Sequence, residues 1–185
     1  MEDLLKIRKF YELKKVYRMN TVENRKESSA EHTYSCLILA DYLLSSLKLK
    51  LDKIKVYELL LYHDVVEIEA GDIPIHHLEK KKNKKENELK ALHSLKDKIP
   101  KLLKSKFVNL FLEFEEQKTR EAKFAKAVDK LDAIIHELDY KKDWKGWSEK
   151  FYRSLNDEPF IQFPELKNAY ETINDFARKN SYFDD

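Results

Sequence analysis

The sequence is short of the residues that break regular structure. It holds only two glycines and four prolines in 185 residues, and its single cysteine is Cys36. Proteins built of β-sheets use glycine and proline freely in their turns, so this scarcity predicts a mostly helical fold. One cysteine excludes a disulfide within the chain and favours a reducing compartment. We therefore expect a cytoplasmic protein.

Long apolar runs and an excess of one charge are also missing. No stretch is long and apolar enough to span a membrane, and the amino-terminal segment lacks the pattern of a signal peptide. The 36 basic side chains nearly balance the 34 acidic ones and leave a formal net charge of +2. We therefore expect neither secretion nor a membrane span, and no binding to nucleic acid or to a membrane surface.

What is present is a series of helical patterns in a chain of domain size. With 42% apolar and 38% charged side chains, the chain suits one soluble globular unit. We expect residues 1–185 to form a single all-α domain, a helical bundle with helical additions at both termini. The apolar spacing predicts helices at 3–17, 30–49, 52–70, 101–117, 119–142 and 165–180. The other segments are interpreted as a polar loop at 18–29, an exposed helix or loop-helix at 79–98, and a short helix plus loop at 144–164.

The predicted helix at 52–70 is the most informative segment. Asp52 suits its N-cap, Gly71 suits a left-handed end, and its middle is apolar around most of its circumference, which is typical of a buried helix. His63 and Asp64 lie in that middle, where an unpaired ionised carboxylate would be costly. A divalent metal such as Mn, Co, Fe or Zn would supply the missing partner. A buried His–Asp pair without metal is the alternative.

Two further candidate ligands lie in neighbouring predicted helices. His32 stands near the start of the helix at 30–49, which Ser28 and Glu31 open with the spacing of a capping box. Asp129 interrupts the apolar face of a later helix. If these helices share a core, four ligands meet at one point. The alternatives are a surface histidine at 32 and an exposed ion pair between Asp129 and a neighbouring lysine.

Three sequence motifs together resemble a known family. They are Glu31-His32, the stretch LYHDVVEIEAGDIP from Leu61 to Pro74, and AKAVDKLDAI from Ala125 to Ile134. The set resembles the HD-domain superfamily and is similar in detail to the HD-domain 5′-deoxynucleotidases. The resemblance covers nearly the whole chain and implies a metal-dependent phosphohydrolase that releases phosphate from (deoxy)nucleoside 5′-monophosphates.

The resemblance also implies roles for individual residues. It implies one divalent metal ion (Mn, Co, Fe, Zn or Mg) held by His32, His63, Asp64 and Asp129. Glu67 would orient or deprotonate the attacking water, and Asp72 would assist the leaving group or contact the sugar. Arg18 would bind the substrate phosphate. The family often has Trp beside that arginine, whereas Met19 stands here, and nearby Arg25 competes for the phosphate role.

Several alternatives stay open at this point. Another phosphoester, such as a nucleoside triphosphate or a cyclic nucleotide, is a second substrate class, and an HD-type di-iron oxygenase is a third possibility. The family also implies a homodimer, for which Phe107, Phe111 and Phe114 offer a candidate apolar surface. Cys36 is interpreted as a core residue. His76 and His77 are interpreted as loop residues, and Trp144 and Trp147 as packing anchors that could otherwise stack a base.

Overall fold

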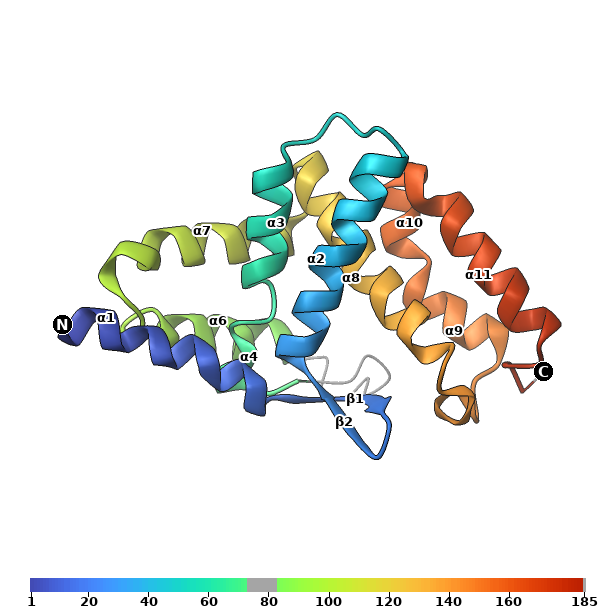
Figure 1. The fold of residues 1–185 in the computed structure, drawn as a ribbon, viewed down its shortest axis with the longest axis horizontal. Helices are drawn as coiled ribbons and strands as arrows, with labels where there is room; N and C mark the ends of the chain where they lie inside the picture. The colour runs from blue at the N-terminus through green and yellow to red at the C-terminus, as the bar shows by residue number, and fades with distance from the viewer. Residues whose placement is uncertain (73–82, 185) are drawn as a thin grey trace.

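A computed structural model describes residues 1–72 and 83–184. His76 and His77, which were interpreted as loop residues, lie outside these ranges. The described chain is helical apart from one hairpin, so the all-α prediction is confirmed (Figure 1). The amino-terminal half comprises helix α1 (Glu2–Leu5), 3-10 helix η1 (Lys6–Lys15), strands β1 (Tyr17–Val22) and β2 (Arg25–Ser28), and helices α2 (Ser29–Ser46), α3 (Lys53–Tyr62), α4 (Glu67–Ala70) and α6 (Lys84–Leu95). The remainder comprises α7 (Lys101–Glu116), α8 (Arg120–Glu137), η2 (Lys141–Trp144), α9 (Glu149–Asn156), α10 (Glu158–Gln162), η3 (Pro164–Leu166) and α11 (Lys167–Lys179).

The core lies where α2, α3, α7 and α8 pack together. Val56, Leu59 and Leu60 of α3 are fully buried there, as expected for a central helix. The caps predicted for two of these helices are confirmed. Ser28 and Glu31 form the capping box of α2, and the Asp52 side chain accepts a hydrogen bond from the Lys55 amide at the start of α3.

The amino-terminal segment is wound differently from the predicted helix at 3–17. Only its first residues form an α-helix, and the rest is the 3-10 helix η1. A 3-10 helix has three residues per turn, so residues spaced by three share one face. Phe10, Leu13 and Val16 have this spacing and all pack against the core. The strict period of three therefore favours the tighter helix.

The polar segment at 18–29 forms an antiparallel hairpin where a loop was predicted. Its register is irregular, because Tyr17 pairs with Ser28 while Thr21 pairs with Lys26. The first strand thus has two extra residues between these pairs, which is a bulge. The bulge turns Arg18 and Asn20 toward other helices, and those long-range contacts are invisible in a polar sequence pattern.

The predicted helix at 52–70 is broken at its most polar point. Helix α3 ends at Tyr62, and α4 begins at Glu67. Between them the backbone makes tighter bonds, such as Glu67 N to Asp64 O at 2.9 Å. Gly71 has a φ of +73°, which confirms the need for glycine there, although its ψ of 157° is extended instead of helical. His63 and Asp64 therefore lie at a turn and not within a continuous helix.

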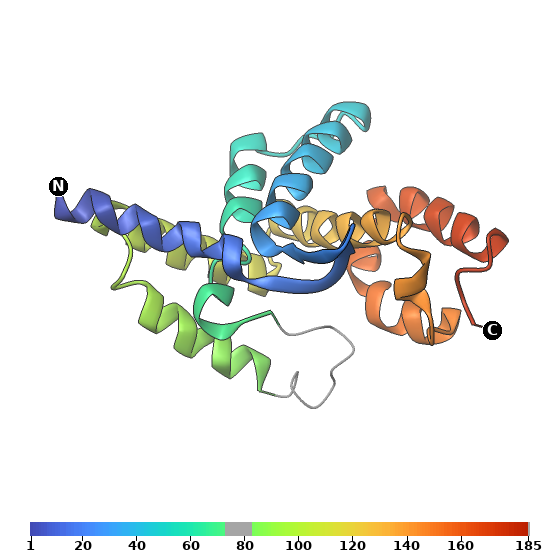
Figure 2. The ribbon, with the colours of Figure 1, turned by 60° about the horizontal axis from the view of Figure 1, so that its bottom comes forward.

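The carboxyl-terminal helices are α9, α10 and α11. Among them, α10 contacts α8 and so joins this group to the rest of the molecule. Figures 1 and 2 show them on the opposite side of the molecule from α1, α6 and α7. Trp144 is buried and stacks on Tyr152, with ring centroids 5.1 Å apart. The interpretation of this tryptophan as a packing anchor is thus confirmed.

One predicted surface is wrong. Phe107, Phe111 and Phe114 are at most 2% exposed, so they belong to the core and offer no surface for a second copy. They face inward because α7 packs against both α3 and α8. Within the described part of the chain, no helix has the length and hydropathy needed to cross a membrane.

Candidate metal centre and active site

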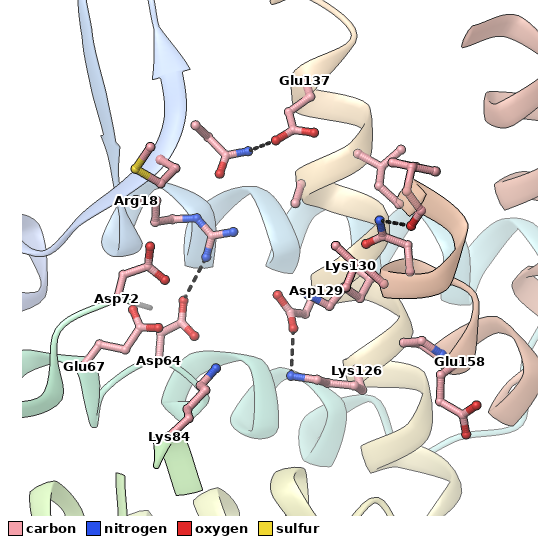
Figure 3. A pocket seen from close by; sticks show the side chains of 18 of the residues that line it. Arg18, Asp64, Glu67, Asp72, Lys84, Lys126, Asp129, Lys130, Glu137 and Glu158 are labelled. Atoms are coloured by element: carbon pink, nitrogen blue, oxygen red, sulfur yellow. Dashed lines mark hydrogen bonds and ion pairs between the residues drawn. The ribbon is translucent and has the colours of Figure 1, made fainter. Parts of the chain in front are cut away.

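A cavity of about 590 Å³ lies beside the break between α3 and α4. Figure 3 shows its polar lining, with β1 and α4 on one side and α8 on the other. Five of the seven predicted site residues line it, and they are Arg18, Asp64, Glu67, Asp72 and Asp129. The remaining two, His32 and His63, are buried directly behind the two aspartates that contact them. The structure thus brings all seven residues to one place.

The two histidines lie with their rings 5.4 Å apart, centroid to centroid. His63 directs Nδ1 at the main-chain oxygen of Leu60, at 2.7 Å. A donor bond there leaves Nε2 with a free lone pair. This Nε2 is buried without a hydrogen bond, 3.1 Å from Oδ1 of Asp64. A buried, unpaired imidazole nitrogen beside a carboxylate is an arrangement suited to binding a metal ion.

His32 is fully buried between two aspartates of α8. Its Nε2 lies 3.1 Å from Oδ1 of Asp129, and its Nδ1 lies 2.9 Å from Oδ2 of Asp132. Burial opposes a charge on the ring, but the bonds to both aspartates outweigh it and raise the pKa of His32. Asp132 holds the ring so that Nε2 faces Asp129, which is the task of an outer carboxylate beside a ligating histidine.

The two candidate carboxylate ligands are ionised. Burial by itself raises the pKa of Asp64, but His63, His32 and Arg18 lower it below its usual range. Likewise, burial of Asp129 is outweighed by Lys126 and by the bond from His32, and its pKa falls. Both groups therefore stay negative over the physiological pH range.

Glu67 and Asp72 behave in the opposite way. Burial raises the pKa of Glu67, and the nearby charges of Asp64 and Asp72 raise it further, while Ser29 donates a hydrogen bond to Oε2 at 2.8 Å. Burial also raises the pKa of Asp72, against the effect of Arg18. Two carboxyl groups that readily hold a proton thus face two that do not, which is typical of acid–base sites.

Arg18, not Arg25, lines the cavity. Arg18 Nε lies 3.2 Å from Glu27 of β2, and Nη1 lies 3.4 Å from Asp64. Arg25 is on the surface, where it forms a two-pronged ion pair with Glu31 at 2.9 and 2.6 Å. The cavity therefore receives the guanidinium of Arg18 alone.

Two lysines of α8 add positive charge to the cavity. Lys126 lies 3.1 Å from Oδ2 of Asp129 and over the ring of Phe114. Lys130 lines the cavity without an ion pair in the described part of the chain. Burial lowers the pKa of Lys130 to about 8 despite the charge of Asp129. An anion entering here meets a free ammonium group.

The donor chemistry suits a divalent metal ion, although among the described residues the donor atoms that all lie within 4.8 Å of one another are those of His32, His63 and Cys36, without the two aspartates. Two buried imidazoles each have an aspartate oxygen within 3.1 Å, and one imidazole nitrogen lacks a hydrogen bond. Cys36 also places its sulfur within 4.8 Å of the nitrogens of His32 and His63. Burial raises the pKa of Cys36 to about 12, so the thiol stays protonated. This agrees with its interpretation as a core residue.

Sequence reasoning missed some of the groups that build this site. Asp132 follows Asp129 by three residues, so helical spacing could have placed both on one face. Glu27 and Ser29 gave no such signal. Glu27 meets Arg18 because the chain folds into the β1–β2 hairpin, where a loop was predicted. Ser29 meets Glu67 only when α2 is packed against α4.

Comparison with known proteins places this arrangement among related chains. The family model for the HD domain matches residues 10–167. The chain is 31% identical over 157 residues to the 5′-deoxynucleotidase HDDC2 of Xenopus laevis, covering 84% of this chain and 75% of that protein. It is 28% identical over 181 residues to the HDDC2 protein of Danio rerio, covering 95% and 88%.

A solved structure shares the fold and the extent of the chain. It is described as a predicted metal-dependent phosphohydrolase from Magnetospirillum magnetotacticum, and it aligns with a TM-score of 0.83 at 26% identity. The alignment covers 97% of this chain and 93% of that one. The similarity therefore includes the helices on both sides of the cavity.

Proposed function

Because this chain belongs to the HD-domain family, we propose that it releases inorganic phosphate from deoxynucleoside 5′-monophosphates. The protein is a metal-dependent phosphohydrolase, and its curated relatives carry the name 5′-deoxynucleotidase. The observation that carries the proposal is a candidate metal centre that shares one cavity with Arg18 and with Lys130, which has no ion pair among the described residues. Such a cavity suits a terminal phosphate.

In this proposal one divalent ion is held by His32, His63, Asp64 and Asp129. The unpaired Nε2 of His63 and the ionised state of both aspartates support the assignment. When bound, such an ion lowers the pKa of water and neutralises phosphate oxygens. Imidazole and carboxylate ligands are compatible with Mn, Co, Fe or Zn, and Mg belongs to the range to be tested.

Glu67 is the proposed general base. Its carboxyl group lines the cavity beside Asp64, and the hydroxyl of Ser29 fixes one of its oxygens. A general base works best when its pKa lies near the working pH, and the raised pKa of Glu67 moves it in that direction. Glu67 then takes a proton from the attacking water.

The phosphate lies between Arg18 and Lys130 in this proposal. Arg18 forms ion pairs with Glu27 and Asp64, which hold its guanidinium at the cavity wall, so it loses little freedom when it binds a phosphate. Lys130 offers a second cation from the opposite wall, as Figure 3 shows. Asp72 lies on the Arg18 side, where its raised pKa suits a donor to the leaving 5′-oxygen.

A phosphate-release screen tests the proposal. The purified protein is incubated with the four deoxynucleoside monophosphates, their triphosphates and a cyclic nucleotide, each with Mg, Mn, Co, Ni or Zn. We expect inorganic phosphate and nucleoside from the monophosphates. Pyrophosphate or triphosphate as the product, or turnover of the cyclic nucleotide alone, would instead support another phosphohydrolase class. An O₂-dependent reaction with two irons bound per chain would indicate the oxygenase alternative.

We also propose a cytoplasmic homodimer. The single cysteine, Cys36, is buried and has no second cysteine in the chain to pair with, which supports a reducing compartment. With the phenylalanines of α7 buried, we take the exposed apolar side chains of α2 as the candidate surface. They are Tyr34, Ile38 and Tyr42, spaced at one helical repeat. Sedimentation velocity of the wild type and of an Ile38→Glu variant tests this: a monomer in both would overturn it.

A further inference from the structure

The cavity extends well beyond the metal centre. Asp129, Ala133 and Glu137 are spaced by four along α8, and all three line it. Eight residues of α-helix rise about 12 Å, a distance comparable to the reach of a nucleotide from its phosphate to the far edge of its base. Ala133 projects only a methyl group, which leaves the middle open. The cavity is therefore long enough for a whole nucleotide.

The strand β1 spans the same interval on the opposite wall. Arg18 reaches Asp64 at the metal end, whereas Asn20 donates from Nδ2 to Oε1 of Glu137 at 3.1 Å. His136 supports this alignment by a hydrogen bond to the main-chain oxygen of Thr21, at 2.7 Å. The positions along α8 and along β1 thus agree that Glu137 lies at the end of the cavity where a base would lie.

The far end is rich in hydrogen-bond acceptors. Oε2 of Glu137 has no partner in the described part of the chain, because Asn20 takes only Oε1. Asp143 lines the same end, with Oδ2 accepting from the Thr21 amide. Tyr152 also lines the cavity, and it is 3% exposed with a hydroxyl that lacks any partner among residues 1–72 and 83–184. An unpartnered buried hydroxyl beside an open carboxylate oxygen indicates a missing polar ligand.

Two tryptophan side chains join the polar groups at this end. Trp144 and Trp147 line it, and the indole nitrogen of Trp144 donates to the main-chain oxygen of Glu137 at 2.9 Å. That bond fixes the position of Glu137 from behind. A planar aromatic ligand with N–H groups on one edge suits such a chamber.

We propose that Glu137 recognises the nucleobase and makes guanine the preferred base; this inference rests on the proposed function. Guanine carries a ring N–H and an amino group side by side, and a carboxylate accepts such a pair through two parallel bonds. Adenine and cytosine each offer an amino group next to a ring acceptor, which a carboxylate repels. Thymine offers one N–H between two carbonyl groups.

The electrostatics of Glu137 agree with this assignment. Burial raises the pKa of its carboxyl to about 7, and Asp143 adds to the effect. The ionised group is therefore short of donors in the protein, and the N–H pair of a guanine supplies them. Two donors gained by an under-satisfied carboxylate favour the matching base over a base with acceptors at that edge.

The experiment compares kcat/KM for dGMP, dAMP, dCMP and dTMP at pH 8, where Glu137 is ionised. We expect the wild type to prefer dGMP over dTMP by about tenfold or more, as for sites built to bond a substrate N–H. Glu137→Gln should remove most of this preference, mainly through the KM for dGMP. The Gln amide keeps the bond to Asn20 but turns an N–H₂ group toward the base.

Glu158→Gln is the matched control. Glu158 lines the same cavity, but Figure 3 shows it on the far side of Lys130 from Glu137. Glu158→Gln removes one negative charge, as Glu137→Gln does, and it should leave the ratio of kcat/KM for dGMP to kcat/KM for dTMP unchanged. A wild type that hydrolyses all four nucleotides equally, or an equal loss of preference in both variants, overturns the inference. Failure to release phosphate from any nucleotide would instead defeat the proposed function.

Discussion

Two networks of charged side chains lie on opposite sides of the cavity, and they differ mainly in burial. At the metal end, Arg18, Asp64 and Asp129 join His32 in the interior. Near the carboxyl terminus, the partly exposed side chain of Arg153 binds Glu149 at 2.9 Å and Glu171 at 2.6 Å. The second network has the shorter contacts, yet its charges remain partly in water.

The comparison separates good ion-pair geometry from functional importance. Surface pairs are screened by water and contribute little to stability, however short they are. Buried charges carry a desolvation cost that their mutual attraction only partly offsets. A chain that gathers several buried charges around an open cavity therefore accepts that cost for a reason other than stability, and ligand binding is such a reason.

The largest effect expected from the buried network is that of His63→Ala. It removes the unpaired Nε2, so the protein should lose its metal, and hydrolysis should fall by about a thousandfold or more. Elemental analysis and kcat/KM measure both quantities. His93→Ala is the control, since His93 is exposed and contacts Lys96 on the surface. Full metal content in the His63 variant would contradict the ligand assignment.

Glu67→Gln should separate chemistry from metal binding. Loss of a general base lowers kcat by about 10²–10⁴-fold, whereas the metal content stays that of the wild type. Glu69→Gln on the same short helix is the matched control, because Glu69 pairs with Lys9 and Lys98 away from the cavity. Equal kcat in the two variants would remove Glu67 from the mechanism.

Asp132→Asn tests whether the outer carboxylate belongs to the buried network. The amide still contacts His32 but no longer holds its ring as firmly, so metal affinity should fall by about 10–100-fold. Titration with a competing chelator measures it, and Asp139→Asn on the exposed side provides the comparison. An unchanged dissociation constant would make Asp132 a purely structural partner.

Glu137 should make the unfolding free energy of the protein depend on pH. Its pKa is raised to about 7 in the folded protein, so the folded state holds a proton that the unfolded state releases near its ordinary value. The folded state therefore loses stability as the pH rises from the ordinary pKa of a glutamate to about 7, and the loss is complete above pH 7. Relative to Glu137→Gln, the wild type should lose on the order of 1–2 kcal/mol of unfolding free energy between pH 5 and pH 8. Urea denaturation of both proteins at these pH values measures the difference, and parallel curves would contradict the burial of the carboxyl.

The smallest effect is expected from the surface network. Arg153→Met should lower the unfolding free energy by less than about 1 kcal/mol, and added salt should shrink the difference. Phosphate release should stay at the wild-type rate. A loss above that size, or one insensitive to salt, would show that the two networks differ less than their burial suggests.

The sequence predicted the fold class and the family better than the local geometry around the site. The helical class, the capping box at Ser28 and the family resemblance are confirmed, and each depends on residues close together in the chain. The hairpin at 18–29 and the break after Tyr62 were not predicted. The metal ligands and the catalytic role of Glu67 stay predictions, supported by the way the cavity gathers them.

Amino-acid identity by itself determined that a His–Asp pair in an apolar segment needs a partner, because an ionised carboxylate cannot be buried alone. Only the tertiary structure decided who the partners are. In the folded chain Arg18, and not Arg25, lies beside Asp64 at the cavity, and Asp132 contacts His32. It also aligned β1 with α8, so that a cavity runs from Asp64 to Glu137. The physical reason is that local patterns encode burial and helix ends, whereas this cavity is formed by residues that meet across a hundred positions of chain or more.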